Sequence, residues 1–327
     1  MMNDLNTWNI WITGASGFIG SALLHKILKE NVPFQKVYAT DIRPISEEFL
    51  HPRIEFIKCD VRDDGLSSLM KKYDITHVIH LAAIVTPSNK SNREFEFSVD
   101  VLGTRNILKS CIDNKISQII TTSSGAAYGS YANMPAWLKE SDPIRGNQEF
   151  AYSYHKRLVE EDLKTYRENY PELKQLILRP GTILGKRVKN QITDLFKKPF
   201  VLGIQGSDSP FVFIWDEDVV EIIFQGLAIG KEGIFNLAGD GAVTLKEIAR
   251  ILKRPYIPLP PKLLEVALKY LKKWGLTQYG PEQINLIRYR PVLDNQNLKQ
   301  NFLFMPRYSS KECFLHYLEE GSGIFHR

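Results

Sequence analysis

Short apolar runs alternate with amphipathic stretches along the first half of the chain. The runs are rich in β-branched and aromatic residues, as expected of buried strands. They span residues 9–13, 36–41, 54–60, 77–83, 118–124 and 175–180. Between them, stretches such as 21–30, 94–114 and 152–170 carry apolar residues at helical spacing. The alternation predicts βαβ units, and therefore an α/β fold with a Rossmann-type doubly wound parallel sheet.

The pattern of apolar runs and amphipathic stretches changes after Gly185. Strand candidates at 211–215 and 233–239 alternate with helices, one of which opens with Thr244 and Glu247 in a capping-box pattern. We therefore expect residues 1–185 to form the Rossmann domain. Residues 186–327 should form mainly a smaller C-terminal α/β lobe, with some segments returning to the core sheet.

A proline-rich segment, 254–261, predicts a turn or an extended connector. It leads into a helical stretch, 262–275, whose apolar stripe is flanked by lysines. The stripe consists of Leu263, Leu264, Ala267, Leu268 and Leu271. We interpret this stretch as a helix that packs in a core or covers a pocket. The alternative is a helix that lies on a membrane surface.

The composition is that of a globular protein. The 327 residues are 43% hydrophobic and 24% charged, and no apolar run approaches the roughly 18 residues that would span a bilayer. A net charge of +5 without a dense basic block argues against nucleic-acid binding and leaves anionic small molecules as partners. The three cysteines are far apart and lack metal-ligand spacing, so we expect no metal site and a reducing compartment. Because the first residues also lack a signal-peptide pattern, we expect a cytoplasmic protein.

Three glycines, Gly14, Gly17 and Gly20, lie where the first strand candidate meets the first helix candidate, in TGASGFIG. Such glycines permit a tight turn, the approach of a pyrophosphate to the backbone and close packing of helix on strand. The helix N-terminus offers N–H groups to phosphates. Asp41 closes the second strand candidate, where a carboxylate can bind an adenosine ribose. Together they predict dinucleotide binding, in preference to a glycine-rich turn without function.

A second pattern is YSYHK, in which Tyr152 and Lys156 share one helix face. A nearby ammonium favours the phenolate, which makes Tyr152 a candidate general base. Tyr154 points elsewhere and is expected to pack. A serine in TTSSGAAYG, 121–129, is a candidate hydrogen-bond donor to a substrate oxygen at the same edge of the sheet.

These motifs, in this order and spacing, resemble those of the extended short-chain dehydrogenases/reductases, in the NAD-dependent epimerase/dehydratase branch. The resemblance covers at least residues 9–220, and 292–306 resembles the family's closing segment. Further matching motifs are Asp60-Val61, HLAA at 80–83 and LRPGTILG at 178–185. The resemblance implies an oxidoreductase or isomerase that acts on a nucleotide sugar.

The resemblance also implies residue roles. Ser124 and Tyr152 would be catalytic, with Lys156 holding the nicotinamide ribose and tuning the tyrosine. The other cofactor-binding positions would be Gly14, Gly17, Phe18, Ile19, Gly20, Asp41, Asp60, Val61, Leu81, Ala82 and Ala83. We expect NAD rather than NADP, because Asp41 would repel a 2′-phosphate. Arg43, which could swing to such a phosphate, argues the other way.

Three segments depart from the family's pattern. Asp100 stands where an Asn is usual, no Thr-Asp-Glu follows the fifth strand, and 209–213 reads SPFVF where an Arg-Asp-aromatic sequence is typical. A nucleotide diphosphate needs cationic or N–H donors. Tentative substrate-binding residues are therefore Ser124, Arg187, Phe211, Arg288 and Arg290.

Several functional hypotheses stay open at this stage. The leading one is epimerisation of a nucleotide sugar through hydride transfer at a secondary alcohol carbon. The alternative is a dehydrogenase or ketoreductase of an uncharged hydroxy or keto substrate, in a pocket lined by Phe211, Phe213 and Trp215. A catalytically idle NAD-binding sensor or assembly subunit is a third. By resemblance we expect a homodimer paired through helices around 92–113 and 150–168, where Phe95, Phe97, Val101, Leu158, Val159 and Leu163 supply apolar surface.

Overall fold

The structure, a computed structural model, describes residues 7–30, 34–85, 92–186, 188, 190–275, 280–281 and 283–320. Its contacts divide the chain into two compact units, each assembled from separate segments. The first comprises 1–124, 155–179 and 216–235, and the second comprises 125–154, 180–215 and 236–327. The domain boundary expected near residue 185 stays a prediction, because compact units need not fold independently.

A seven-stranded sheet forms the centre of the first unit, in the order β10-β6-β5-β4-β1-β2-β3. Its strands are β1 (Asn9–Thr13), β2 (Lys36–Asp41), β3 (Ile54–Lys58), β4 (His77–His80), β5 (Gln118–Thr122), β6 (Lys174–Pro180) and β10 (Gly233–Leu237). All pairs from β6 to β3 are parallel. The order reverses between β1 and β4, and ligands of doubly wound sheets bind at the carboxyl ends of such a pair. The predicted Rossmann-type sheet is confirmed.

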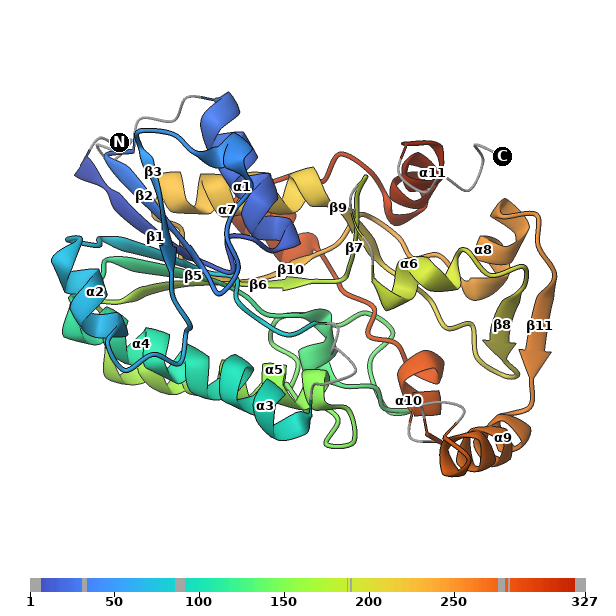
Figure 1. The fold of residues 1–327 in the computed structure, drawn as a ribbon. Coiled ribbons are helices and arrows are strands. Elements are labelled where there is room, and N and C mark those ends of the chain that lie inside the picture. Colours follow the sequence, from blue (N-terminus) through green and yellow to red (C-terminus); the bar gives the residue numbers. More distant parts are fainter. Residues whose placement is uncertain are drawn as a thin grey trace. The chain divides into compact units, whose positions relative to one another are not determined.

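Helices cover both faces of this sheet. Figure 1 shows α1 (Phe18–Lys29) and α7 (Asp216–Ala228) on one face, with α2 (Leu66–Lys72), α4 (Gly103–Asp113) and α5 (Ala151–Asn169) on the other. A short helix α3 (Arg93–Phe97) continues into α4 through a π-helical turn, Ser98–Leu102. The core on the α2, α4 and α5 side includes Trp11, Val78, Ile107 and Leu163. A 3-10 turn, Glu47–Phe49, precedes β3.

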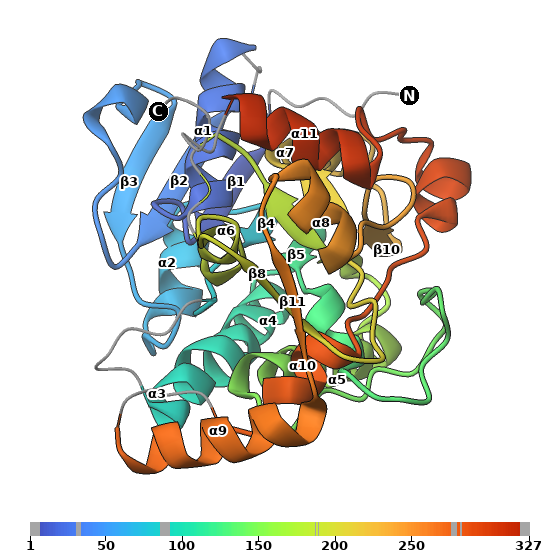
Figure 2. The same ribbon diagram turned by 90° about the vertical axis from the view of Figure 1, so that its right-hand side faces the viewer.

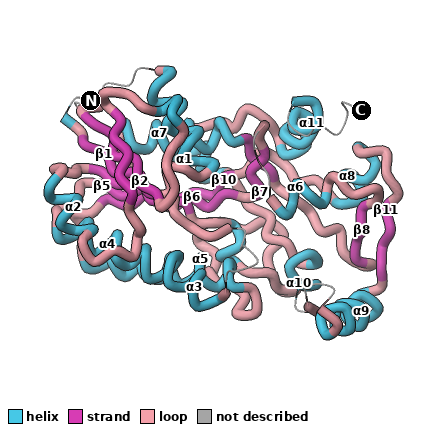
Figure 3. The backbone as a smooth tube through the Cα atoms, viewed as in Figure 1, coloured by secondary structure: helices cyan, strands magenta, loops and turns pink. Residues whose placement is uncertain are grey.

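The second unit contains two small parallel sheets. In one, β7 (Thr182–Leu184) pairs with β9 (Phe213–Trp215). In the other, which Figure 3 shows, β8 (Val201–Ile204) pairs with β11 (Tyr256–Leu259). The segment expected to be a turn or connector therefore contains a strand. Its prolines are tolerated because a two-stranded sheet consists of edge strands.

Helices and short turns complete the second unit. They are α6 (Gln191–Leu195), α8 (Leu245–Ile251), α9 (Pro261–Lys273), α10 (Gln283–Arg288) and α11 (Ser310–Glu320), with turns at Gly125–Tyr128 and Leu298–Phe302. The capping box predicted from Thr244 and Glu247 is present at the start of α8. Among all helices within the described ranges, none is both long and apolar enough to cross a membrane.

Candidate active site

The glycine loop lies at the carboxyl end of β1 and ends at the start of α1. Gly14 has φ +68°, and a Cβ there would lie 2.7 Å from the backbone nitrogen of Ala82. A Cβ at Gly20 would overlap the carbonyl oxygen of Gly14 and lie 2.7 Å from the Cα of Ala15. Gly17 is the N-cap of α1, where no side chain caps the helix and no acidic residue occupies the first turn. The loop therefore keeps its backbone open to an anionic group, as a pyrophosphate site requires.

Phe18 and Ile19, the first two residues of α1, are half-buried. They follow the loop directly, as the expected pyrophosphate contact requires. Their contact with a cofactor stays a prediction.

Asp41 fixes the far side of this loop. Its carboxylate accepts hydrogen bonds from the backbone nitrogens of Ser16 (3.1 Å) and Arg43 (3.0 Å). Each oxygen keeps lone pairs for further donors, so the carboxylate can also accept ribose hydroxyls. The Arg43 guanidinium is exposed, and its Nε lies 3.8 Å from Asp41 Oδ1.

Asp60 and Val61 follow β3. The Asp60 carboxylate binds the Arg62 guanidinium through two contacts, of 2.9 and 2.6 Å, and this bond lowers the pKa of Asp60. Val61 is buried in the first unit's core. Their expected place beside the adenine stays a prediction.

The segment after β4 lies directly against the glycine loop. The backbone nitrogens of Leu81 and Ala82 both donate to Thr13 Oγ1, at 3.2 and 3.3 Å. Both residues and Ala83 are half-buried. The structure thus brings together two segments that were expected to flank the cofactor and that are separated by about sixty residues in the chain.

A buried histidine, to which the sequence motifs assign no role, holds these segments together. His80 Nδ1 lies 2.7 Å from Thr13 Oγ1, and His80 Nε2 lies 2.9 Å from Thr104 Oγ1. Because Thr104 donates its own hydroxyl to the carbonyl of Asp100, its oxygen accepts from Nε2, which leaves Nδ1 to accept from Thr13. Burial and the charge of Lys156 lower the pKa of His80 to about 3. The histidine is neutral and links β1, β4 and α4.

Asp100 replaces the family's usual asparagine and lies in the π-helical turn before α4. Its Oδ1 accepts from the backbone nitrogen of Ile84 (2.8 Å), and its Oδ2 lies 3.3 Å from His155 Nδ1. Asp100 and His155 are both buried. An asparagine could accept from Ile84 equally well, but the carboxylate adds a negative charge close to Lys156.

Lys156 is buried on α5, and its Nζ donates to the carbonyl oxygen of Thr122 at the end of β5 (2.9 Å). Burial lowers the pKa of Lys156, while the charges of Asp100 and Glu160 oppose that shift. The buried ammonium is thus bound to a strand end and lies within the electrostatic influence of two carboxylates. This is the placement expected of a lysine that binds a ribose and tunes a nearby phenol.

Tyr152 lies four residues before Lys156, in the first turn of α5, and is half-buried. Both side chains therefore leave the same face of the helix. Ser124 is half-buried just beyond β5. Ser124 belongs to the first compact unit and Tyr152 to the second, so the expected meeting of their hydroxyls stays a prediction.

Two neighbours of the candidate serine are structural. Ser123 is buried and donates to Glu160 Oε1 (2.5 Å), which also accepts from Arg179 Nε (2.8 Å). Tyr128 is buried in the second unit, where its hydroxyl lies 2.9 Å from Asn236 Oδ1. Ser124, by contrast, is half-buried.

The second unit holds the tentative substrate residues. The Arg290 guanidinium lies 3.8 Å from the centre of the Phe211 ring, and burial lowers the pKa of Arg290 to about 10. Arg288 ends α10, with its guanidinium 5.1 Å from the Tyr289 ring. Within the described residues, no carboxylate forms an ion pair with either arginine. Arg187 lies outside the described residues.

The alternative pocket lined by three aromatic residues is not open. The Phe213 ring is fully buried and stacks on those of Phe211 (5.6 Å) and Phe314 (5.5 Å). Trp215 is buried in the same core. These side chains fill the second unit's core, so an uncharged substrate would have to bind elsewhere.

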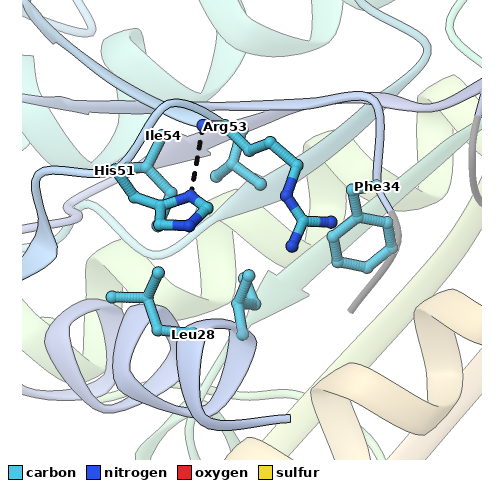
Figure 4. A pocket seen from close by; sticks show the side chains of 7 residues that line it. Leu28, Phe34, His51, Arg53 and Ile54 are labelled. Atoms are coloured by element: carbon cyan, nitrogen blue, oxygen red, sulfur yellow. Dashed lines mark hydrogen bonds between the residues drawn. The ribbon is translucent and has the colours of Figure 1, made fainter. Parts of the chain in front are cut away.

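A small cavity in the first unit lies away from this site. Figure 4 shows its lining by Leu28, Phe34, His51, Arg53 and Ile54, and its volume is about 20 Å³. Such a volume holds about one water molecule. It therefore has no room for a substrate.

Comparison with known proteins places the chain in a family. The model of the NAD dependent epimerase/dehydratase family matches residues 10–238. A putative UDP-glucose 4-epimerase of Methanocaldococcus jannaschii is 27% identical over 257 residues, which are 75% of this chain and 81% of that protein. An uncharacterized protein of Mycobacterium tuberculosis is 23% identical over 320 residues, or 96% of this chain and 84% of that protein.

Solved structures share the fold. The dTDP-glucose 4,6-dehydratase of Bacillus anthracis, in complex with NAD, has a TM-score of 0.71 at 17% identity and covers 98% of this chain and 99% of its own. The Bordetella bronchiseptica enzyme WbmG, in complex with NAD and UDP, has a TM-score of 0.72 at 19% identity, with 97% and 96% covered. In this chain the glycine loop packs against the segment after β4, and the lysine of α5 binds the end of β5; their joint contact with a cofactor stays a prediction. With the family model matching more than half of its length, the chain belongs to the NAD dependent epimerase/dehydratase family.

Proposed function

We propose that this protein binds NAD and epimerises a secondary alcohol carbon of a nucleotide sugar. The observation that carries the proposal is the glycine loop, packed against Ala82 and bordered by Asp41, at the point where the strand order reverses. Nucleotides bind at this position in doubly wound sheets. The absence of an acidic pair after β5, in TSSGAAYG, favours epimerisation over dehydration.

The residues present fit the cofactor. The loop 14–20 would bind the pyrophosphate, Asp41 the adenosine ribose, and Asp60 with Val61 the adenine. Leu81 to Ala83 would line the nicotinamide side, with Lys156 on the second ribose. NAD bound there supplies a hydride acceptor. We propose NAD over NADP because the Asp41 carboxylate would repel a 2′-phosphate.

Tyr152 is the proposed acid/base. The buried ammonium of Lys156, one helical turn away, favours the phenolate form of the tyrosine, which can then take the proton of the substrate hydroxyl. Ser124 would donate a hydrogen bond to the same substrate oxygen. Asp100 and Glu160 stabilise the charge of Lys156 and so support its effect on the phenol.

A nucleotide sugar is the proposed substrate because the second unit carries cationic groups suited to a diphosphate. Arg290 is partly desolvated, and a desolvated guanidinium binds phosphate strongly and in a fixed geometry. The relatives support the same class: one is named for UDP-glucose and another is solved with UDP.

The test is turnover of a panel of UDP- and dTDP-sugars by the wild type, Tyr152→Phe and Tyr154→Phe. Losing the acid/base should lower the rate by about 10²- to 10⁴-fold, while NAD binding persists because the ring is kept. Tyr154→Phe, a matched change two residues away, should retain most activity. A Tyr152→Phe enzyme with near wild-type turnover would refute the assignment.

We also propose a homodimer formed through α3, α4 and α5. Of the six apolar residues expected to supply its surface, Val101, Val159 and Leu163 are buried in the core instead. Of the other three, Phe95 is 42% exposed, and Leu102, which was not in the expected set, adds a second exposed apolar side chain (44%). Light scattering should give twice the monomer mass, and a Phe95→Lys/Leu102→Lys variant should be monomeric. A wild type that is monomeric at micromolar concentration contradicts the proposal.

A further inference from the structure

The helix α9 carries an exposed apolar stripe. No residue of α9 is buried, so the expectation that it packs in a core is wrong, while the expectation that it covers a pocket stays a prediction. This α9 stripe consists of Leu263 (57% exposed), Val266 (53%), Tyr270 (48%) and the C-cap Trp274 (67%). It shares only Leu263 with the apolar positions that the sequence indicated. The three- and four-residue spacing of its members places them on one face of the helix. The Tyr270 and Trp274 rings lie 5.8 Å apart along it.

A different face of α9 attaches it to the second unit. Leu264, Ala267 and Leu268 are half-buried, and α9 contacts α10. Figure 2 shows β11 running directly into α9, with α10 beside it. The helix is therefore held to the protein on one side while the α9 stripe faces outward.

Lysines border the α9 stripe along its length. At about 100° per residue, Lys262, Lys269 and Lys273 fall on one flank of the stripe, and all three are exposed. One acidic residue, Glu265, stands among the thirteen residues of the helix. An exposed apolar stripe with aromatic residues and a cationic flank matches the two layers of an anionic membrane surface: acyl chains under the stripe and negative headgroups beside the lysines.

We propose that α9 docks this protein on an anionic lipid bilayer, with the helix lying in the plane of the interface. Thirteen residues are about 20 Å of helix, too short to span the hydrocarbon core. Tyr270 and Trp274 have the apolar ring and polar tip that favour the headgroup level. The net charge of +5 adds a general attraction to anionic lipid.

A second copy of the chain is a poorer occupant of this stripe. An antiparallel two-fold contact through the same face would bring the three lysines of one helix toward those of the other. With one glutamate on the helix, most of this repulsion would be uncompensated. Anionic headgroups instead neutralise the lysines.

The first test is flotation of the full-length protein with vesicles of phosphatidylcholine alone and of phosphatidylcholine with phosphatidylglycerol. The wild type should float with the anionic vesicles, weakly with the neutral ones, and less at high salt, which screens exposed charges. No flotation with anionic vesicles overturns the proposal. Equal flotation with both vesicle types overturns the claim that the lysines bind anionic headgroups.

Two variants test the α9 stripe and its flank separately. Val266→Glu/Tyr270→Glu should abolish flotation, whereas the charge-matched pair Leu50→Glu/Met305→Glu, at exposed apolar positions outside α9, should retain it. If both pairs behave alike, the stripe is not the docking surface. Circular dichroism and NAD titration establish that each variant is folded.

If the stripe variant does not fold, a lysine variant tests the proposal instead. Lys262→Gln/Lys269→Gln/Lys273→Gln should weaken binding to anionic vesicles roughly tenfold or more. Lys29→Gln/Lys71→Gln/Lys311→Gln, with the same charge change at exposed positions elsewhere, should lose far less. Equal losses in the two triples would assign binding to net charge rather than to α9. A stripe variant that converts an oligomer to a monomer, in a protein that does not float, would assign the face to a second copy.

Discussion

Replacing Glu160 tests the buried ion pair behind the candidate site. Glu160 and Arg179 are 5% and 3% exposed, and their side chains form contacts of 2.8, 3.0 and 2.5 Å. Glu160→Ala leaves the buried guanidinium without its carboxylate and Ser123 without its acceptor. Removing one partner of a buried pair costs about 3–5 kcal/mol of unfolding free energy. We expect a loss in that range.

The adjacent residue provides the control. Glu161 forms an ion pair with Arg157 at 2.7 Å, but both side chains are at least one-third exposed. Exposed pairs four residues apart contribute about 0.3–0.5 kcal/mol, so Glu161→Ala should lower the stability by no more than this. A third variant, Glu160→Leu/Arg179→Met, removes both buried charges and should lose less than Glu160→Ala, since no charge is left unpaired.

The assay is equilibrium unfolding in urea, followed by circular dichroism and compared at constant NAD concentration. If Glu160→Ala and Glu161→Ala differ by less than about 1 kcal/mol, the argument from burial fails. NAD affinity gives a second readout. Glu160 follows Lys156 by one helical turn on α5 and supports the charge of that lysine, so Glu160→Ala should also weaken NAD binding.

Three further predictions concern the loop, the buried histidine and the substrate arginines. Gly20→Ala should weaken NAD binding strongly because its Cβ would overlap the loop backbone. The control Gly65→Ala should leave NAD affinity unchanged, since nothing lies within 4 Å of a Cβ there. Equal NAD affinities of the two variants would contradict this. His80 has a folded-state pKa of about 3, below the unfolded value near 6.5, so it takes up protons mainly in the unfolded state. Wild-type stability should therefore fall as pH drops below about 6.5, and that of His80→Gln should fall less steeply. Parallel stability–pH profiles of the two proteins would refute this. Arg288→Ala or Arg290→Ala should weaken binding of a nucleotide sugar well beyond Lys71→Ala, as measured by thermal shift of the NAD-loaded protein; no difference would favour an uncharged substrate.

The sequence predicted the bounds of the strands well where an apolar run ends at the same residue as the strand. The strands at 9–13 and 36–41 have the expected bounds. Those starting at 54, 77 and 118 end two or three residues earlier than expected. Except for Asp60, the residues beyond their ends are apolar or small, so the apolar pattern continues although the backbone leaves the sheet to form the loops of the candidate site.

Contacts between residues far apart in the chain could not be predicted from the sequence. The strand Val201–Ile204 pairs with Tyr256–Leu259 because Gly203 leaves room for the Tyr256 ring, and neither segment indicates the other. The His80 network and the contact of Asp100 with His155 likewise join residues far apart in the chain. For α9, the pattern predicted an amphipathic helix but not which part of its apolar surface faces the protein.

Titration of NAD and NADPH into the nucleotide-free protein is decisive for the proposed cofactor site, because the glycine loop, Asp41 and Lys156 are all assigned to one dinucleotide. We predict that NAD binds more tightly than NADPH, and that Asp41→Asn narrows the difference by removing the charge that repels a 2′-phosphate. Tighter binding of NADPH would reverse the role of Asp41 in favour of Arg43. Binding of neither dinucleotide to a folded protein would contradict the account.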